Sequence, residues 1–128
     1  MAAKTRGAIQ VFIAVPSTAV ARRIAASLLD ARLCACAQTL GPVQSRYLWK
    51  GKPESAREWL LLVKTRAALY EGVEREVRRL HPYEVPEILA VPVAAGLGAY
   101  LGWLQRETRP PKTRRARRAS GARATGAE

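Results

Sequence analysis

The sequence predicts an α+β fold with the element order βαββαβ and a short extra helix near the C-terminal end. Four short runs rich in aliphatic and β-branched residues indicate strands. Two segments repeat apolar residues every three to four positions, as helices packed on a sheet do. Because a tight turn joins the second and third strands, they form a hairpin. Right-handed crossovers then give the split-βαβ, ferredoxin-like sandwich.

The N-terminal third of the chain supplies the first strand and helix. Residues 8–15, AIQVFIAV, form a short apolar run that predicts a buried strand. Ser17 or Thr18 can cap the helix that follows, because a hydroxyl at this position accepts a backbone N–H of the first turn. The helix is expected to end at about residue 32. Its apolar stripe consists of Val20, Ile24 and Leu28.

The middle of the chain predicts the hairpin. Residues 33–40 have strand character, Gly41-Pro42 indicates a bend or bulge, and the strand continues beyond it. The tip is expected at residues 50–52, where Gly51 supplies a positive φ. Residues 57–65, REWLLLVKT, predict the return strand.

The remaining elements are a helix, a strand and a closing helix. A second helix is predicted at residues 67–80, and it ends there because Pro82 disfavours helical geometry at His81. Residues 87–93 predict the fourth strand and residues 100–105 the closing helix. Since the two main helices cover one face of the sheet, the other face is bare, which implies oligomerisation or a ligand.

Charge divides the chain into a domain and a tail. Half of the net charge of +12 lies in residues 109–128, which hold seven basic residues against one acidic residue. This stretch has almost no apolar residue besides alanine, so we expect a disordered basic tail that binds nucleic acid only non-specifically. Residues 1–7 are expected to be a short flexible N-terminus, and residues 8–108 to be one domain, as suits a chain of 128 residues.

The class of protein is narrowed by motifs that the sequence lacks. It has no secretory signal and no apolar run near 18 residues, so a soluble cytoplasmic protein without a membrane segment is expected. It contains no G-x-S-x-G, P-loop or G-x-G-x-x-G motif, and we expect no enzymatic activity. Neither inner strand carries the basic-aromatic motif with which RNA-recognition domains stack bases.

Three residues could bind a metal ion. Cys34 and Cys36 share a face if their segment is a strand, and two thiolates at that spacing suit a soft ion such as Cu(I). Tight packing of two small side chains explains the same pattern, whereas a disulfide between them would be strained. His81, the only histidine, could be a metal ligand or proton shuttle, or it could cap the helix at a carbonyl. A closed zinc site needs four ligands, so these three are one short.

Aromatic residues gather at the hairpin. Tyr47, Trp49 and Trp59 flank it and could form a shelf for a ligand. Cross-strand pairing of aromatic rings explains them equally well without a ligand. Because the hairpin extends from a small domain, contact with another subunit is a further expectation.

Four ordered blocks resemble the CutA family of divalent-cation tolerance proteins. The blocks are ARLCACAQTLGPVQSRYLWKGK, WLLLVKTR, LHPYEVPEILAVPV and YLGWL, and the match covers roughly residues 8–106. The corner at residues 81–87, HPYEVPE, is the most specific part of the match. Five positions depart from the family pattern: Ile13, Cys34, Gln38, Leu48 and Leu80. Cys34 stands where alanine is usual, and Leu80 stands where some bacterial relatives have a second histidine.

The resemblance implies a ferredoxin-like protomer in a tight homotrimer that binds divalent metal ions, copper above all. It also implies no obligatory cofactor and no enzymatic activity. Its implied metal ligands are Cys36 and His81, with Cys34 assisting. Further residues are expected in a cleft between subunits: Tyr47, Trp49, Lys64, Tyr83, Glu84 and Glu87. Since the family's trimer resembles PII signalling proteins, the alternative is a signalling or scaffold trimer that binds a small anionic ligand in this cleft.

Overall fold

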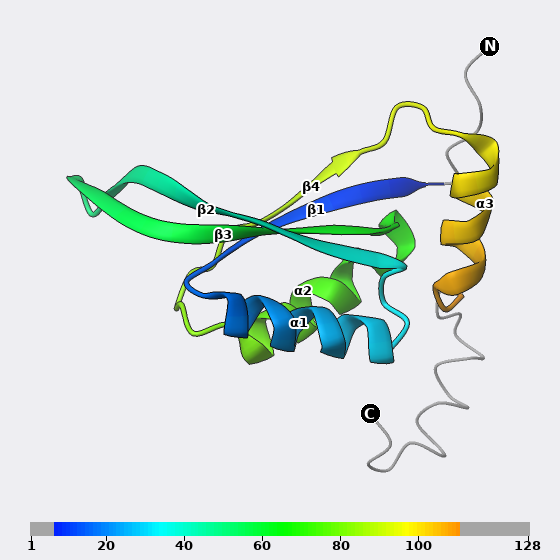
Figure 1. Cartoon of the computed structure of the whole chain (residues 1–128), viewed down its shortest axis with the longest axis horizontal. Helices are drawn as coiled ribbons and strands as arrows, with labels where there is room; N and C mark the ends of the chain where they lie inside the picture. Colours follow the sequence, from blue (N-terminus) through cyan, green and yellow to red (C-terminus); the bar gives the residue numbers. More distant parts are fainter. Residues whose placement is uncertain (1–6, 111–128) are drawn as a thin grey trace.

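The computed structural model describes residues 7–110, which form one four-stranded sheet, three α-helices and a short 3-10 helix (Figure 1). The elements in chain order are β1 Ala8–Val15, α1 Thr18–Asp30, β2 Cys36–Trp49, β3 Lys52–Arg66, η1 Ala67–Leu69, α2 Tyr70–Leu80, β4 Ile88–Pro92 and α3 Gly98–Glu107. This order confirms the predicted βαββαβ arrangement with a closing helix. No helix within the described range is long and apolar enough to cross a membrane.

The strands lie in the order β2-β3-β1-β4, and all neighbouring pairs are antiparallel. The connection through α1 does not make β1 and β2 neighbours. Instead β3 lies between them, which is the strand order of the ferredoxin-like sandwich. Figure 1 shows α1 and α2 on one face of the sheet and α3 at one end of it. The β2–β3 hairpin extends beyond the other end.

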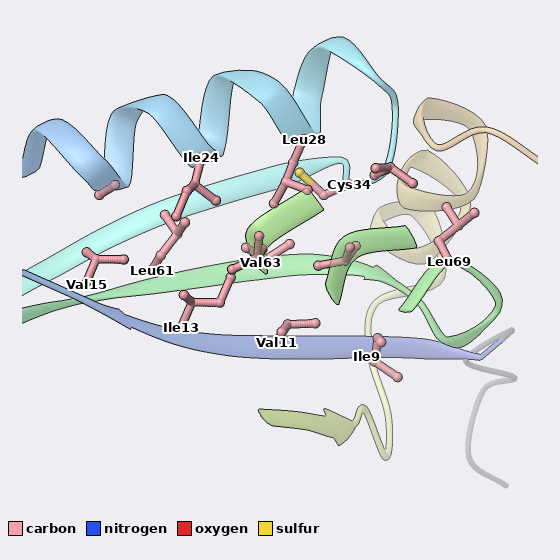
Figure 2. Packing of buried hydrophobic residues seen from close by; sticks show 14 residues of the cluster. Ile9, Val11, Ile13, Val15, Ile24, Leu28, Cys34, Leu61, Val63 and Leu69 are labelled. Atoms are coloured by element: carbon pink, nitrogen blue, oxygen red, sulfur yellow. The ribbon is translucent and has the colours of Figure 1, made fainter. Parts of the chain in front are cut away.

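The main core lies between the two central strands and the helix pair α1–α2. Alternate residues of these strands are fully buried and point towards the helices (Figure 2): Val11, Ile13, Val15, Leu61 and Val63. They meet Ile24 and Leu28 of α1 and Val73 and Val77 of α2. Each such side chain contributes about 1.5–3 kcal/mol on burial. A slip of one residue would turn the whole set outward, so the core fixes the register of β1 against β3.

Both main helices have the ends that the sequence predicts. Ser17 caps α1 by accepting the N–H of Val20 at 3.2 Å. His81 ends α2 in an extended conformation, with φ −81° and ψ 135°, as Pro82 requires. The predicted second helix is confirmed, although its first turn, Ala67–Leu69, is a 3-10 helix.

A polar contact joins the two helices on their outer side. Glu76 of α2 accepts hydrogen bonds from Arg79, at 2.6 Å in the ion pair, and from Ser27 of α1. These donors, Arg79 first and Ser27 second, lower the pKa of Glu76 to about 2. The charged carboxylate therefore contributes to holding α1 beside α2.

Two glycines determine the shape of the hairpin. Gly41 lies in a bulge between Leu40 and Val43, and its peptide bond to Pro42 is cis. A Cβ at Gly41, where φ is 148°, would lie 2.8 Å from Cδ1 of Trp59, so only glycine fits. At the tip, Lys50 and Gly51 have φ of 51° and 77°, as in a two-residue type I′ turn. The predicted bend and tip are both confirmed.

The start of β2 differs from the prediction. The strand begins at Cys36 rather than at residue 33, because the chain first turns after α1, where Arg32 has φ 55°. Cys34 therefore lies in the connection before the strand. Elsewhere the boundaries shift by a few residues: β3 and α3 are longer than predicted and β4 is shorter.

The face of the sheet away from α1 and α2 is only partly covered. α3 packs at one end of it, where Leu101 and Leu104 meet Ala8. Three apolar side chains that the register assigns to the same face remain exposed: Leu40, Leu89 and Val91. Within the described part of the chain, this sheet face therefore keeps an exposed apolar surface, as the sequence predicted.

Candidate functional site

A groove of about 750 Å³ lies where the hairpin, the end of β1 and the corner after α2 meet. Among its lining residues are four glutamates, one arginine and three aromatic residues: Glu54, Glu58, Glu84, Glu87, Arg46, Tyr47, Trp49 and Tyr83. Four carboxylates against one guanidinium make it negative, although the whole chain carries a net charge of +12. We call it the acidic groove.

His81 fixes the corner beside the groove through both of its ring nitrogens. Nδ1 accepts the backbone N–H of Tyr83 at 3.1 Å, which leaves the ring proton on Nε2. Nε2 then donates to the carbonyl oxygen of Ala14 at 2.7 Å. The side chain is 8 % exposed. His81 therefore joins the corner to the end of β1, and neither nitrogen keeps a lone pair for a metal ion.

Tyr83 belongs to the same corner, and its side chain lines the groove. Its hydroxyl donates to Oε2 of Glu58 at 2.9 Å, and its ring lies 4.8 Å from that of His81. Glu58 is only 6 % exposed, so its carboxylate faces little water. Burial, then the hydrogen bond and charge of Glu58, raise the pKa of Tyr83 to about 12. The phenol thus remains a donor at neutral pH and holds the Glu58 carboxylate in the groove.

The two cysteines do not share a face, so that prediction is wrong. Cys34 is 2 % exposed and belongs to the main core, where Figure 2 shows it beside Leu28. Ala37 packs on the same core, so alternation along β2 turns Cys36 to the opposite face of the sheet. Burial, and secondarily the charge of Cys36, raise the pKa of Cys34 to about 12. Since a metal ligand must be a thiolate, Cys34 is poorly suited to that role.

The structure also separates Cys36 from His81. Cys36 pairs with Lys64, which pairs with Gln10 of β1, whereas His81 bonds to Ala14. Four residues along a strand span about 13 Å. Among residues 7–110, no group of three or more histidine, cysteine, aspartate or glutamate side chains is arranged to hold a metal ion. One protomer thus does not assemble the three predicted ligands.

Of the six predicted cleft residues, five line the acidic groove. The exception is Lys64, which lies at the other end of the sheet and donates to Gln38. Sequence reasoning missed Glu54, Glu58 and Arg46. The signal for Glu54 was present, since the hairpin register pairs it with Tyr47.

Comparison with known proteins gives a consistent result. Residues 9–107 match the family described as CutA1 divalent ion tolerance protein. The chain is 45 % identical over 98 residues to the divalent-cation tolerance protein CutA of Thermus thermophilus, covering 77 % of this chain and 95 % of that one. It is 38 % identical over 106 residues to the chloroplastic CutA protein of Arabidopsis thaliana, covering 83 % of this chain but only 58 % of the relative.

A solved structure agrees with the sequence comparison. The divalent cation tolerance protein (Cut A1) from Thermus thermophilus superimposes with a TM-score of 0.78 at 43 % identity. The alignment covers 80 % of this chain and 99 % of that one. The shared part is the sandwich that carries the acidic groove, so the fold and the sequence lead to the same assignment.

Proposed function

This chain belongs to the CutA1 divalent ion tolerance family, and on that premise we propose that it is a non-enzymatic homotrimer that binds metal ions, copper above all. The acidic groove is the observation that carries the divalent-cation part of the proposal, and Cys36 carries the copper part. Carboxylate oxygens are ligands for divalent cations, and here four carboxylates line one groove on a chain that is otherwise basic, although no three of them within residues 7–110 are arranged to hold one ion. A second subunit would supply the ligands that one protomer does not bring together.

Trimer formation is supported by the exposed apolar surface. Leu40, Leu89 and Val91 are exposed on the open sheet face, and Leu48, on the opposite face of the hairpin, is 74 % exposed. Large exposed apolar side chains such as these often mark a protein–protein contact. Their position beside the groove would put a neighbouring subunit within reach of the carboxylates.

Copper binding is proposed chiefly for Cys36. Both cysteines are free thiols, and Cys36 is the one that is not buried in the core. A thiolate is the soft ligand that Cu(I) prefers. Free thiols also favour a reducing compartment, and we propose the cytoplasm. Cys34 and His81, the other two predicted ligands, are better explained by packing and by the corner hydrogen bonds.

A small anionic ligand, the alternative drawn from the sequence, fits the groove less well. Four carboxylates would repel it, and Lys64, which was expected to help bind it, is engaged elsewhere. The charge of the groove therefore favours a cation.

The test is a metal titration of the reduced, full-length protein under anaerobic conditions, with its mass measured by light scattering. Cu(I) and Mn²⁺ are titrated separately, because they probe the thiol and the carboxylates. We expect a mass of three times 14.0 kDa, Cu(I) binding that is lost in Cys36→Ala, and Mn²⁺ binding that is lost in Glu84→Gln/Glu87→Gln.

The matched control is Asp30→Asn/Glu71→Gln, which removes the same charge from exposed positions on α1 and α2. It should bind both ions as the wild type does. A monomeric mass would contradict the trimer. Unchanged stoichiometry in all variants would remove the proposed sites.

A further inference from the structure

The acidic groove fits a second kind of cation, an arginine side chain. Arginine pairs with carboxylates through two parallel hydrogen bonds and stacks on aromatic rings. The groove offers both surfaces, because Glu54 and Glu84 lie with the rings of Tyr47 and Trp49 in one cavity. Nearby cations already use such rings: Lys50 lies 5.9 Å from the ring centre of Trp49, and Arg57 lies 5.7 Å from that of Trp59.

The chain itself contains an arginine-rich stretch. Residues 112–118, KTRRARR, hold five basic residues in seven and lie outside the described range. We propose that this stretch binds in the acidic groove and competes there with metal ions. The competition rests on the proposed function, whereas the binding of the stretch does not.

The length of the chain allows this contact. Arg66 donates to the hydroxyl of Thr108, and Arg66 pairs with Ala8, so the described chain ends near the start of β1. The groove includes Ala14, six residues further along this strand, which is a distance of about 20 Å. Arg118 is eight residues beyond Pro110, and eight extended residues span about 26 Å. The end of the stretch, Arg117 and Arg118, can therefore reach the groove.

A carbodiimide cross-link tests the contact in the full-length protein, because this reagent joins a lysine amine to a carboxylate only when the two touch. Lys112 lies only two residues beyond Pro110 and cannot span about 20 Å, so the lysine is placed at the end of the stretch by Arg118→Lys, which keeps the charge. We expect peptides that join position 118 of this variant to Glu54, Glu84 or Glu87, and their loss at high salt, which screens the pairing. Absence of any such link in Arg118→Lys, while other lysines react, would overturn the proposal.

A second measurement tests the competition with a charge-matched control. The variant Arg114→Ser/Arg115→Ser/Arg117→Ser/Arg118→Ser should bind Mn²⁺ about fivefold more tightly or better, the lower end of common coupling between ligands. The control Arg22→Ser/Arg23→Ser/Arg75→Ser/Arg78→Ser removes the same charge from exposed positions on α1 and α2.

The outcomes separate this inference from the proposed function. A gain in affinity confined to the first variant supports competition in the groove. Equal gains in both variants would mean that net charge alone acts, and would overturn the competition. If no form binds Mn²⁺ but the cross-links of Arg118→Lys appear, the metal proposal fails and the binding of the stretch stands. Cross-links that vanish when nucleic acid is added would identify a polyanion as the stronger partner of the stretch and overturn the groove as its main site.

Discussion

Replacing His81 separates a structural corner from a metal ligand. His81→Ala removes two hydrogen bonds, the one to the Ala14 carbonyl at 2.7 Å and the one from the Tyr83 amide at 3.1 Å. The side chain is 8 % exposed, so water cannot easily replace either bond. Loss of a buried hydrogen bond that leaves its partner unsatisfied costs about 1–3 kcal/mol. We therefore expect the free energy of unfolding to fall by about 2–4 kcal/mol.

The assay is guanidinium unfolding followed by circular dichroism at one fixed protein concentration, because subunit association changes the apparent stability. Two conservative variants show how much of the lost free energy of unfolding belongs to each of the two hydrogen bonds. In His81→Asn a side-chain oxygen can replace Nδ1 as the acceptor for Tyr83, and in His81→Gln the longer amide can donate to Ala14. Each should recover part of the lost free energy. Folded His81→Ala should keep the copper stoichiometry of the wild type.

The opposite pattern would refute this reasoning. If His81→Ala unfolds at the wild-type guanidinium concentration but loses copper, the ring is a ligand and its two hydrogen bonds contribute little. Loss of copper in His81→Asn and His81→Gln, with stability restored, would lead to the same conclusion. Stability and metal binding thus report separately on the two roles.

Three other predictions follow from single contacts. The pKa of Glu76 is lowered to about 2 from an ordinary value of 4.5, so the carboxylate stabilises the fold above pH 4.5 and this stabilisation is lost as the pH falls towards 2. When unfolding midpoints are measured over a series of pH values, Glu76→Gln should lose less stability between pH 4.5 and 2 than the wild type does. An alkylating reagent should modify Cys36 in the native protein and Cys34 only after unfolding, because Cys34 is buried and its thiol has a raised pKa. The labelled residue is identified by mass spectrometry, and labelling mainly at Cys34 in the native protein would contradict its burial. Gly41→Ala should destabilise by about 1–3 kcal/mol in thermal unfolding, whereas Gly98→Ala, where a Cβ meets nothing within 4 Å, should be close to neutral.

The fold could be predicted largely because its signals are local. The alternation of apolar residues in β1, the hydroxyl cap of α1 and the proline after α2 each act over a few residues. The hairpin tip could be predicted from Gly51 for the same reason. Strand ends were less predictable, because they depend on where pairing with another strand begins. For β2 this is decided by the turn after α1, which no residue type around Arg32 indicates.

The site was predicted in part, for reasons that differ between residues. The groove residues near the corner are close in sequence, so Tyr83, Glu84 and Glu87 could be grouped from the sequence alone. The error over Cys34 follows from the late start of β2, since one shifted strand boundary changes which face a side chain takes. Glu58 was missed because its burial arises only when the corner folds over the hairpin, which no local pattern records.

The buried carboxylate of Glu58 links the two proposed occupants of the acidic groove. A carboxylate that is 6 % exposed beside three others loses hydration and is repelled by its neighbours, and the hydroxyl of Tyr83 offsets only part of that cost. Any cation that enters the groove reduces this repulsion in the folded state alone, so it must raise the stability of the fold in proportion to its affinity. A metal ion and an arginine side chain act on the same carboxylates. Their stabilising effects should therefore fail to add, and this non-additivity distinguishes one shared site from two separate ones.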